Sequence, residues 1–185
     1  MIMGKVIVLL GDGFEEIEGL TVVDVLRRAK IDVESVSIMT EQVITGSRNI
    51  KVVADKMFDD IDSDELDMVV LPGGIKGTDN IKAHEGVNKL LLSAKEKGIK
   101  IAAICAAPTA LGKIGLLKGY KATCFPGLEN ELTGAECVDN IVITDGYITT
   151  SKGPATAMDF ALELVKILKD ENVLITVKDG LLFDH

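Results

Sequence analysis

Cysteine and histidine are scarce in this 185-residue sequence, which contains three of the first and two of the second. The odd number of cysteines (Cys105, Cys124 and Cys137) argues against a disulfide framework. The histidines, His84 and His185, stand far apart, and the sequence has no C-x-x-C or H-x-x-x-H pair. Zinc sites usually need such closely spaced ligands, so we expect neither a metal nor another cofactor.

Long apolar runs and basic clusters are also missing. No apolar run approaches the roughly 18 residues that span a bilayer, and the first ten residues lack the pattern of a signal peptide. We therefore expect a cytoplasmic protein without membrane contact. The net charge of −9, with Lys and Arg dispersed, would repel a phosphate backbone, so direct nucleic-acid binding is not expected. Aromatic residues make up only 4%, which leaves a partner surface hard to locate from sequence.

Length and hydrophobic pattern indicate one α/β domain over residues 1–185. Apolar runs of strand length alternate with helical patterns along the chain. The expected strands are 5–10, 32–39, 68–71, 99–104 and 173–177, with a β-excursion at 42–55 and a hairpin of 140–144 with 147–150. The expected helices run to about residue 30, over 85–97, and from the Ser151–Pro154 region to about 169. This alternation predicts a mainly parallel sheet with helices on both faces.

The segment 99–112, I-K-I-A-A-I-C-A-A-P-T-A-L-G, places a thiol where a strand turns into a helix. Cys105 ends the apolar run, and Pro108 suits the first turn of a helix. A nucleophile at such an elbow is lifted above the sheet edge, and small neighbours allow the tight bend. The helix N-terminus is expected to favour the thiolate and lower the pKa of Cys105. The alternative is a buried structural cysteine.

Two further segments follow strands and carry candidate site residues. The loop G-D-G-F-E-E-I-E nearly matches a dinucleotide fingerprint, but Glu15, Glu16 and Glu18 would repel a pyrophosphate, so we reject that interpretation. Glu15 and Glu16 fit partners of the helix dipole, whereas Glu18 also points toward the strand edge where ligands bind in α/β sheets. The second segment, P-G-G-I-K-G, is either a plain turn or a loop that offers backbone N–H groups to an anion.

Four motifs in order, G-F-E-E-I-E, L-P-G-G-I-K-G, A-A-I-C-A-A-P and S-K-G-P-A-T, resemble the ThiJ/PfpI (DJ-one/PfpI) superfamily. The resemblance is closest to the branch with the Parkinson-disease-associated deglycase and bacterial YajL-like proteins. It implies a flavodoxin-like three-layer sandwich with a nucleophile elbow, as in class I glutamine amidotransferases, and usually a homodimer. The residues that match the family site are the nucleophile Cys105, the acid/base Glu18, the oxyanion and substrate positions Gly73, Gly74 and Ala106, and the interface arginines Arg28 and Arg48.

The sequence departs from some relatives at two positions. Phe125 stands where many relatives have histidine, and this removes a possible proton shuttle. YajL-like members also have Phe at this position, so the departure suggests the bacterial branch. Ala106 stands where the peptidase-like branch has a histidine after the nucleophile. With His84 expected at a helix start and His185 at the terminus, a Cys–His dyad is not expected, and neither is peptidase activity.

The resemblance implies a cofactor-independent glyoxalase or protein deglycase that acts on glyoxal, methylglyoxal or early glycation adducts without glutathione. A thiolate at Cys105 would add to the aldehyde, and Glu18 would move a proton between the substrate carbons. Because two adjacent anions are costly, we expect a protonated Glu18 beside the thiolate at rest. The alternative function is a redox-sensing stress protein or chaperone in which Cys105 is oxidised to a sulfinate.

Overall fold

A seven-stranded sheet forms the centre of the computed structural model, which describes residues 5–183. In spatial order the strands are β10 (Val142–Asp145), β11 (Ile148–Ser151), β7 (Lys100–Ile104), β6 (Leu66–Leu71), β1 (Lys5–Leu10), β2 (Asp32–Ser37) and β5 (Lys56–Met57). Neighbouring strands are parallel except for β10, which runs antiparallel to β11. Strand β1 is almost continuously apolar because both faces of a parallel sheet are covered.

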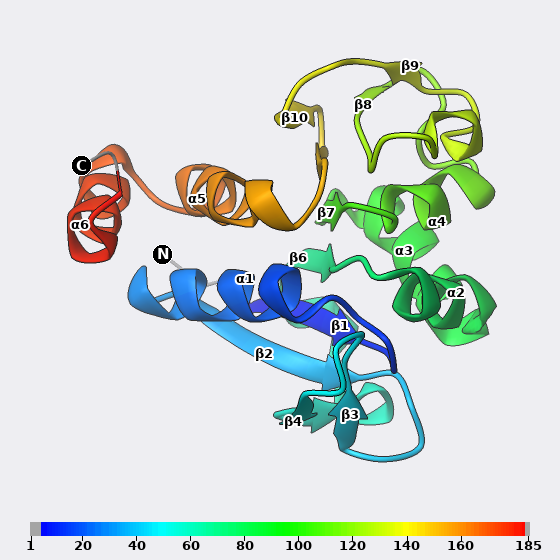
Figure 1. Cartoon of the computed structure of the whole chain (residues 1–185), viewed down its shortest axis with the longest axis horizontal. Helices are drawn as coiled ribbons and strands as arrows, with labels where there is room; N and C mark the ends of the chain where they lie inside the picture. Colours follow the sequence, from blue (N-terminus) through cyan, green and yellow to red (C-terminus); the bar gives the residue numbers. More distant parts are fainter. Residues whose placement is uncertain (1–4, 184–185) are drawn as a thin grey trace.

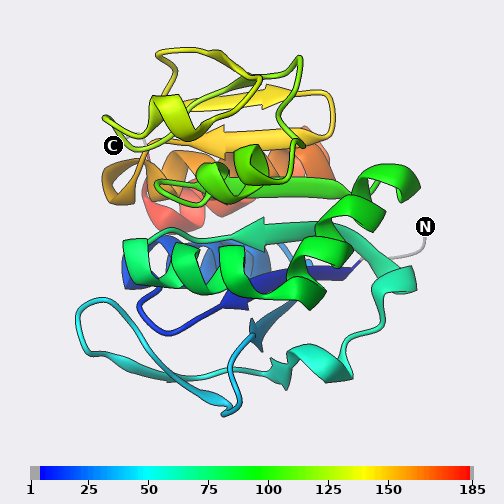
Figure 2. The same cartoon turned by 90° about the vertical axis from the view of Figure 1, so that its right-hand side faces the viewer.

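Helices cover both faces of this sheet (Figure 1). They are α1 (Glu16–Arg28), α2 (Ile75–Ala83), α3 (Glu85–Lys97), α4 (Pro108–Lys113), α5 (Ala157–Leu168) and α6 (Glu171–Leu181). Val6 and Val8 of β1 join the core under α1 and α5, whereas Ile7 and Leu9 join the core under α2, α3 and α4. Figure 2 shows the α2–α4 layer in front of the strands. The expected flavodoxin-like three-layer sandwich is confirmed.

Smaller elements complete the fold. An antiparallel hairpin of β3 (Val43–Thr45) and β4 (Lys51–Val53) confirms the excursion expected at 42–55. A short parallel pair, β8 (Lys121–Ala122) and β9 (Glu136–Cys137), lies in the stretch after α4. Single 3-10 turns are found at Phe58–Asp60, Ser63–Glu65, Glu129–Glu131 and Pro154–Thr156. Within residues 5–183, no helix is long and apolar enough to cross a membrane.

The strand predicted at 173–177 is wrong, because these residues lie inside α6. Val-Leu-Ile-Thr-Val has a high β propensity, but Asp170 caps a helix there by accepting a hydrogen bond from the Val173 N–H at 3.1 Å. Leu174 and Val177, three residues apart, are buried on one helix face. Helix α2 was not predicted, since the glycines at 74 and 77 hide its helical pattern.

Candidate active site

Cys105 occupies a strained turn between β7 and α4. Its φ of +64° is unusual for a residue other than glycine. The conformation is held from two sides, because the Cys105 N–H donates to the Ser151 carbonyl at 2.9 Å and its carbonyl accepts from the Phe125 N–H at 2.8 Å. Pro108 begins α4, as expected for a nucleophile elbow. Cys105 is 8% exposed and lines a cavity.

Glu18 reaches the elbow from the first turn of α1 and is fully buried. Its Oε2 accepts a hydrogen bond from the Gly73 N–H at 2.8 Å. Its Oε1 is buried with no nitrogen or oxygen donor among the described residues. The Cys105 thiol lies within hydrogen-bonding reach of this carboxyl. The fold therefore brings together the two side chains that are 87 positions apart in the sequence.

The pKa values of the two groups are shifted in the same direction. Burial raises the pKa of Glu18 to about 7, although hydrogen bonds from Cys105 and Gly73 act against this. Burial and the charge of Glu18 raise the pKa of Cys105 to about 12, although the N–H groups of Gly74 and Ala106 favour the thiolate. The expected lowering of the Cys105 pKa by the helix N-terminus is therefore wrong, because burial and the neighbouring acid outweigh six-residue α4. Between these two pKa values the pair holds one proton, and the sulfur keeps it because its pKa is the higher one. The expected resting form, a protonated Glu18 beside a thiolate, is therefore also wrong.

Gly73 and Gly74 form the wall opposite the thiol. A Cβ on Gly73 would lie 2.6 Å from Cys105 Cβ and 2.7 Å from Glu18 Oε2. Gly74 has a φ of +85°, and a Cβ there would lie 2.3 Å from the Gly13 carbonyl oxygen. Its N–H lies near the thiol of Cys105 and favours the thiolate there. Of the two interpretations of P-G-G-I-K-G, the structure thus favours a loop that presents backbone N–H groups to a negative charge.

Substituting Gly74 by alanine should destabilise the fold by about 2–4 kcal/mol, because a backbone clash adds to an unfavourable φ. The matched control is Gly98→Ala, where φ is +72° and no atom lies within 4 Å of the added Cβ. That variant should lose only about 1 kcal/mol. Urea unfolding of both variants measures the difference, and equal losses would show that the close approach at Gly74 is unimportant.

The cavity in front of Cys105 has a volume of about 470 Å³. Its lining comes from the loop before α1, the β3–β4 hairpin, the start of α2, the elbow and the segments at 125 and 154. The lining residues are Gly13, Glu15, Thr45, Gly46, Ser47, Arg48, Asn49, Gly74, Ile75, Lys76, Cys105, Phe125 and Pro154. The predicted residues Cys105, Gly74 and Arg48 therefore meet here. Gly73 and Ala106 are not part of this lining but adjoin Cys105, because Gly73 packs against its Cβ and Ala106 follows it in the chain.

Glu16 positions Arg48 at this cavity, a role that sequence reasoning missed. The carboxylate of Glu16 accepts hydrogen bonds from Ser47 Oγ at 2.9 Å and from the Arg48 N–H at 2.7 Å. Burial alone would raise the pKa of Glu16, but these bonds outweigh it and the pKa is lowered. The sequence alone does not distinguish Glu16 from an ordinary partner of the helix dipole, because the hairpin residues that it binds lie far away in the sequence.

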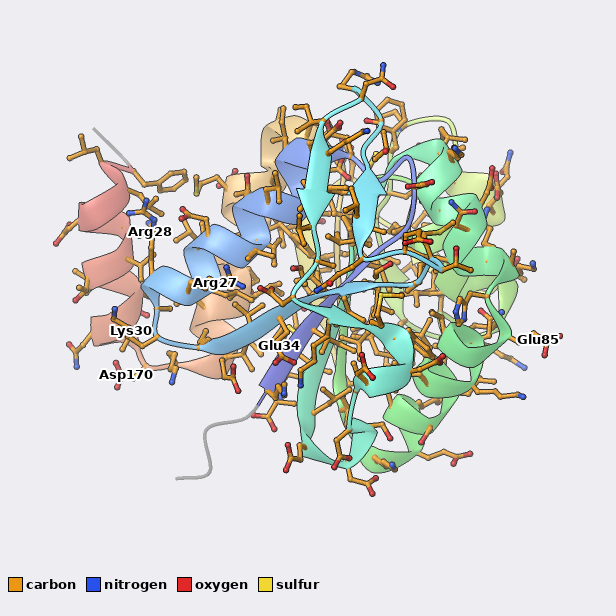
Figure 3. All side chains as sticks on the ribbon, turned by 90° about the horizontal axis from the view of Figure 1, so that it is seen from below. Arg27, Arg28, Lys30, Glu34, Glu85 and Asp170 are labelled. Carbon is orange, nitrogen blue, oxygen red and sulfur yellow. The ribbon has the colours of Figure 1, made fainter. Side chains whose placement is uncertain are left out.

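Arg28 lies away from the cavity in the chain described. It ends α1 beside α6 (Figure 3), and its Nε donates to Asp24 Oδ2 at 2.7 Å. The resemblance places this arginine near a dimer interface, so its part in the site stays a prediction.

Histidine is absent from the lining just described, which has Phe125 instead. His84 caps α3, where its Nδ1 accepts from the Val87 N–H at 3.1 Å, and His185 lies outside the described residues. Burial raises the pKa of Cys124 to about 12, and this thiol lies in a different pocket. No group of three or more His, Cys, Asp or Glu in residues 5–183 could hold a metal ion.

Known proteins share this sequence and fold. Protein dj-1beta of Drosophila melanogaster is 37% identical over 178 residues, which cover 95% of each chain. Deglycase TK1284 of Thermococcus kodakarensis is 33% identical over 169 residues, covering 89% of this chain and 99% of the relative. The solved structure of oxidized Toxoplasma gondii DJ-1 superimposes with a TM-score of 0.94 at 31% identity, covering 98% of this chain and all of the other.

Some relatives are much longer. Protein DJ-1 homolog B of Arabidopsis thaliana is 36% identical over 163 residues, which are 88% of this chain but only 37% of that protein. A sequence model of the DJ-1/PfpI family matches residues 4–167. Matches of this length and identity mean that the chain belongs to the DJ-1/PfpI family.

Proposed function

We propose that the protein converts small 2-oxoaldehydes such as glyoxal and methylglyoxal to 2-hydroxy acids without glutathione, and acts on early glycation adducts. The observation that carries this proposal is the buried pair of Glu18 and Cys105, which shares a proton beside two N–H groups at the cavity wall. Such a pair supplies a nucleophile and an acid/base within one contact. The name of the Thermococcus relative, a deglycase, supports the reaction class.

The first step forms a carbon–sulfur bond. Moving the shared proton from Cys105 Sγ to Glu18 Oε1 makes the thiolate, which attacks the aldehyde carbon of methylglyoxal. The carbonyl π electrons move to oxygen, and the N–H groups of Gly74 and Ala106 are placed to stabilise negative charge there. Glu18 then donates its proton to that oxygen. The product is a hemithioacetal, and Glu18 is left as a carboxylate.

The second step is an internal redox change. Carboxylate Glu18 removes the proton from the former aldehyde carbon, giving an enediolate, and returns it to the neighbouring carbon, while the hydroxyl proton of the first carbon passes to the oxygen of the second. The first carbon is thereby oxidised to a thioester and the second reduced to an alcohol, so no external oxidant is needed. Carboxylate Glu18 then takes a proton from the water that attacks the thioester, the carbon–sulfur bond breaks, and the sulfur leaves as a thiolate. The acid product loses its proton to solvent and leaves as lactate, while the proton on Glu18 stays with the pair and restores its starting state.

The test is lactate formation from methylglyoxal by the purified protein, with a chelator present and glutathione absent. Below pH 7 both groups are protonated, and above it one proton has left, because the pKa of Glu18 is about 7. The apparent kcat/KM should therefore rise with pH through about 7. A protein that forms no lactate at pH 8 would contradict the proposal.

Peroxide sensing by Cys105 is the second candidate function. Its support is the same carboxyl, since a protonated Glu18 could hold a cysteine sulfinate by a hydrogen bond. The similar Toxoplasma gondii structure is that of an oxidized DJ-1 protein. Two results together would favour this function. Peroxide should add two oxygens to Cys105, and the protein should turn over no dicarbonyl.

We also propose that two chains form a homodimer. Exposed apolar side chains gather on α1 and the β3–β4 hairpin: Ile17, Leu20, Val43, Ile50 and Val53. Such a patch is typical of an interface.

Light scattering at micromolar concentration should give twice the chain mass, and Val53→Lys should lower the measured mass. The control Leu92→Lys changes an exposed residue on α3 and should stay dimeric; a monomeric wild type would exclude the dimer.

A further inference from the structure

The cavity at Cys105 is larger than methylglyoxal requires. Methylglyoxal has five non-hydrogen atoms, which occupy roughly 150 Å³ at the volume of about 30 Å³ that one water takes in the liquid. The cavity volume is about 470 Å³. A substrate bound to Cys105 could therefore extend well beyond the two reacting carbons. The chemistry of the lining beyond the thiol indicates what that extension would carry.

Two cationic side chains line the cavity. Arg48 comes from the β3–β4 hairpin and Lys76 from the first turn of α2. The guanidinium of Arg48 donates to the Ser47 carbonyl at 3.3 Å, and neither cation has an ion-pair partner within residues 5–183. The stem of Lys76 lies against Gly13, where a Cβ would come within 2.6 Å of Lys76 Cβ. Both cations are thus free to bind an anion.

Helix α2 adds positive potential at the same place. Its N-cap, Gly74, has no side chain to accept a hydrogen bond, and its first turn contains no acidic residue. The acid in the described lining is Glu15, whose Oε2 already accepts from the Glu18 N–H at 2.9 Å. The lining therefore carries two cations and a helix N-terminus against one carboxylate.

We infer that Lys76, together with Arg48, binds a carboxylate on the substrate, so that the protein prefers 2-oxoaldehydes with a carboxylate end. This inference rests on the proposed function for its chemistry. A suitable substrate is 4,5-dioxopentanoate, whose aldehyde would react with Cys105 while its carboxylate lies toward Lys76. Adding one water gives 2-hydroxyglutarate, with the aldehyde carbon oxidised and the ketone carbon reduced, so the overall reaction balances without another reagent.

The first experiment compares kcat/KM for 4,5-dioxopentanoate with that for neutral 2-oxopentanal, which has the same number of carbons. The ratio should fall about three- to tenfold in Lys76→Met, since an exposed cation interacts moderately with a nearby anion. Methionine keeps the stem of the side chain and removes only the charge. The control Lys89→Met changes the net charge equally on exposed α3 and should keep the wild-type ratio. Added salt should lower the wild-type ratio toward that of Lys76→Met.

The second experiment does not depend on turnover. Alkylation rates of Cys105 with iodoacetate and with iodoacetamide are measured by peptide mapping, because the reagents differ mainly in charge. The rate ratio of iodoacetate to iodoacetamide should fall in Lys76→Met and fall further in Lys76→Glu, but not in Lys89→Met. Equal ratios in all four proteins would overturn the inference, even if methylglyoxal is turned over. A shifted ratio without lactate formation would instead support anion binding and contradict the proposed function.

Discussion

Cys105→Ser should reduce lactate formation from methylglyoxal by about 10³-fold or more, because a serine hydroxyl is a far weaker nucleophile and leaving group than a thiol. The geometry of the elbow should be kept, since Ser can occupy the same strained turn and keep the N–H and carbonyl bonds to Ser151 and Phe125. Lactate assays and melting temperatures on the same samples separate chemistry from folding.

The matched control for this variant is Cys137→Ser, which makes the same chemical change on exposed strand β9. It should keep wild-type turnover. If Cys105→Ser retained substantial activity while Cys137→Ser behaved like wild type, the thiol of Cys105 would not be the nucleophile. The first step proposed above would then fail.

Glu18→Gln should reduce turnover by roughly 10²–10⁴-fold, the loss expected when a general acid/base is removed. Glutamine can still accept the Gly73 N–H bond and donate to the sulfur, but it cannot carry a proton between substrate carbons. A role in the helix dipole alone would leave turnover unchanged and cost at most about 1 kcal/mol of stability. Unchanged turnover would therefore leave the mechanism without its base.

The same variant should change how stability depends on pH. The pKa of Glu18 rises from 4.5 to about 7 on folding, so between these values the folded protein binds more protons than the unfolded chain. The free energy of unfolding of the wild type is therefore expected to fall as pH rises through this window, and Glu18 accounts for about 3 kcal/mol of that fall. Glutamine does not titrate, so Glu18→Gln should be more stable than wild type at pH 8.

Urea unfolding of wild type and Glu18→Gln at pH 4.5 and pH 8 measures this contribution. The difference in unfolding free energy between the two proteins should move in favour of the variant by about 3 kcal/mol between these pH values. Other titrating groups are common to both proteins and cancel in the comparison. A difference that stays constant with pH would show that Glu18 has no raised pKa.

Local sequence patterns determined the elbow and most of the sheet. The apolar run before Cys105 is typical of a buried strand in length and composition, and Pro108 could begin a helix without losing a hydrogen bond. Gly98 could likewise end α3 in a left-handed conformation, at φ +72°. These features depend on neighbours a few residues away, so the sequence alone was enough to predict them.

The tertiary structure alone decided the electrostatics of the site. The sequence placed a helix N-terminus beside Cys105, but the pKa of the thiol is raised because folding buries it against Glu18. Glu16 looked like an ordinary partner of the helix dipole until the hairpin packed against it. Lys76 lies in a helix that the sequence did not predict, and only the tertiary fold places it at the cavity. At 173–177, burial of Leu174 and Val177 in the core overrode β propensity. Burial, and contacts between segments far apart in sequence, set these outcomes, because the environment of a charge depends on every segment that packs around it.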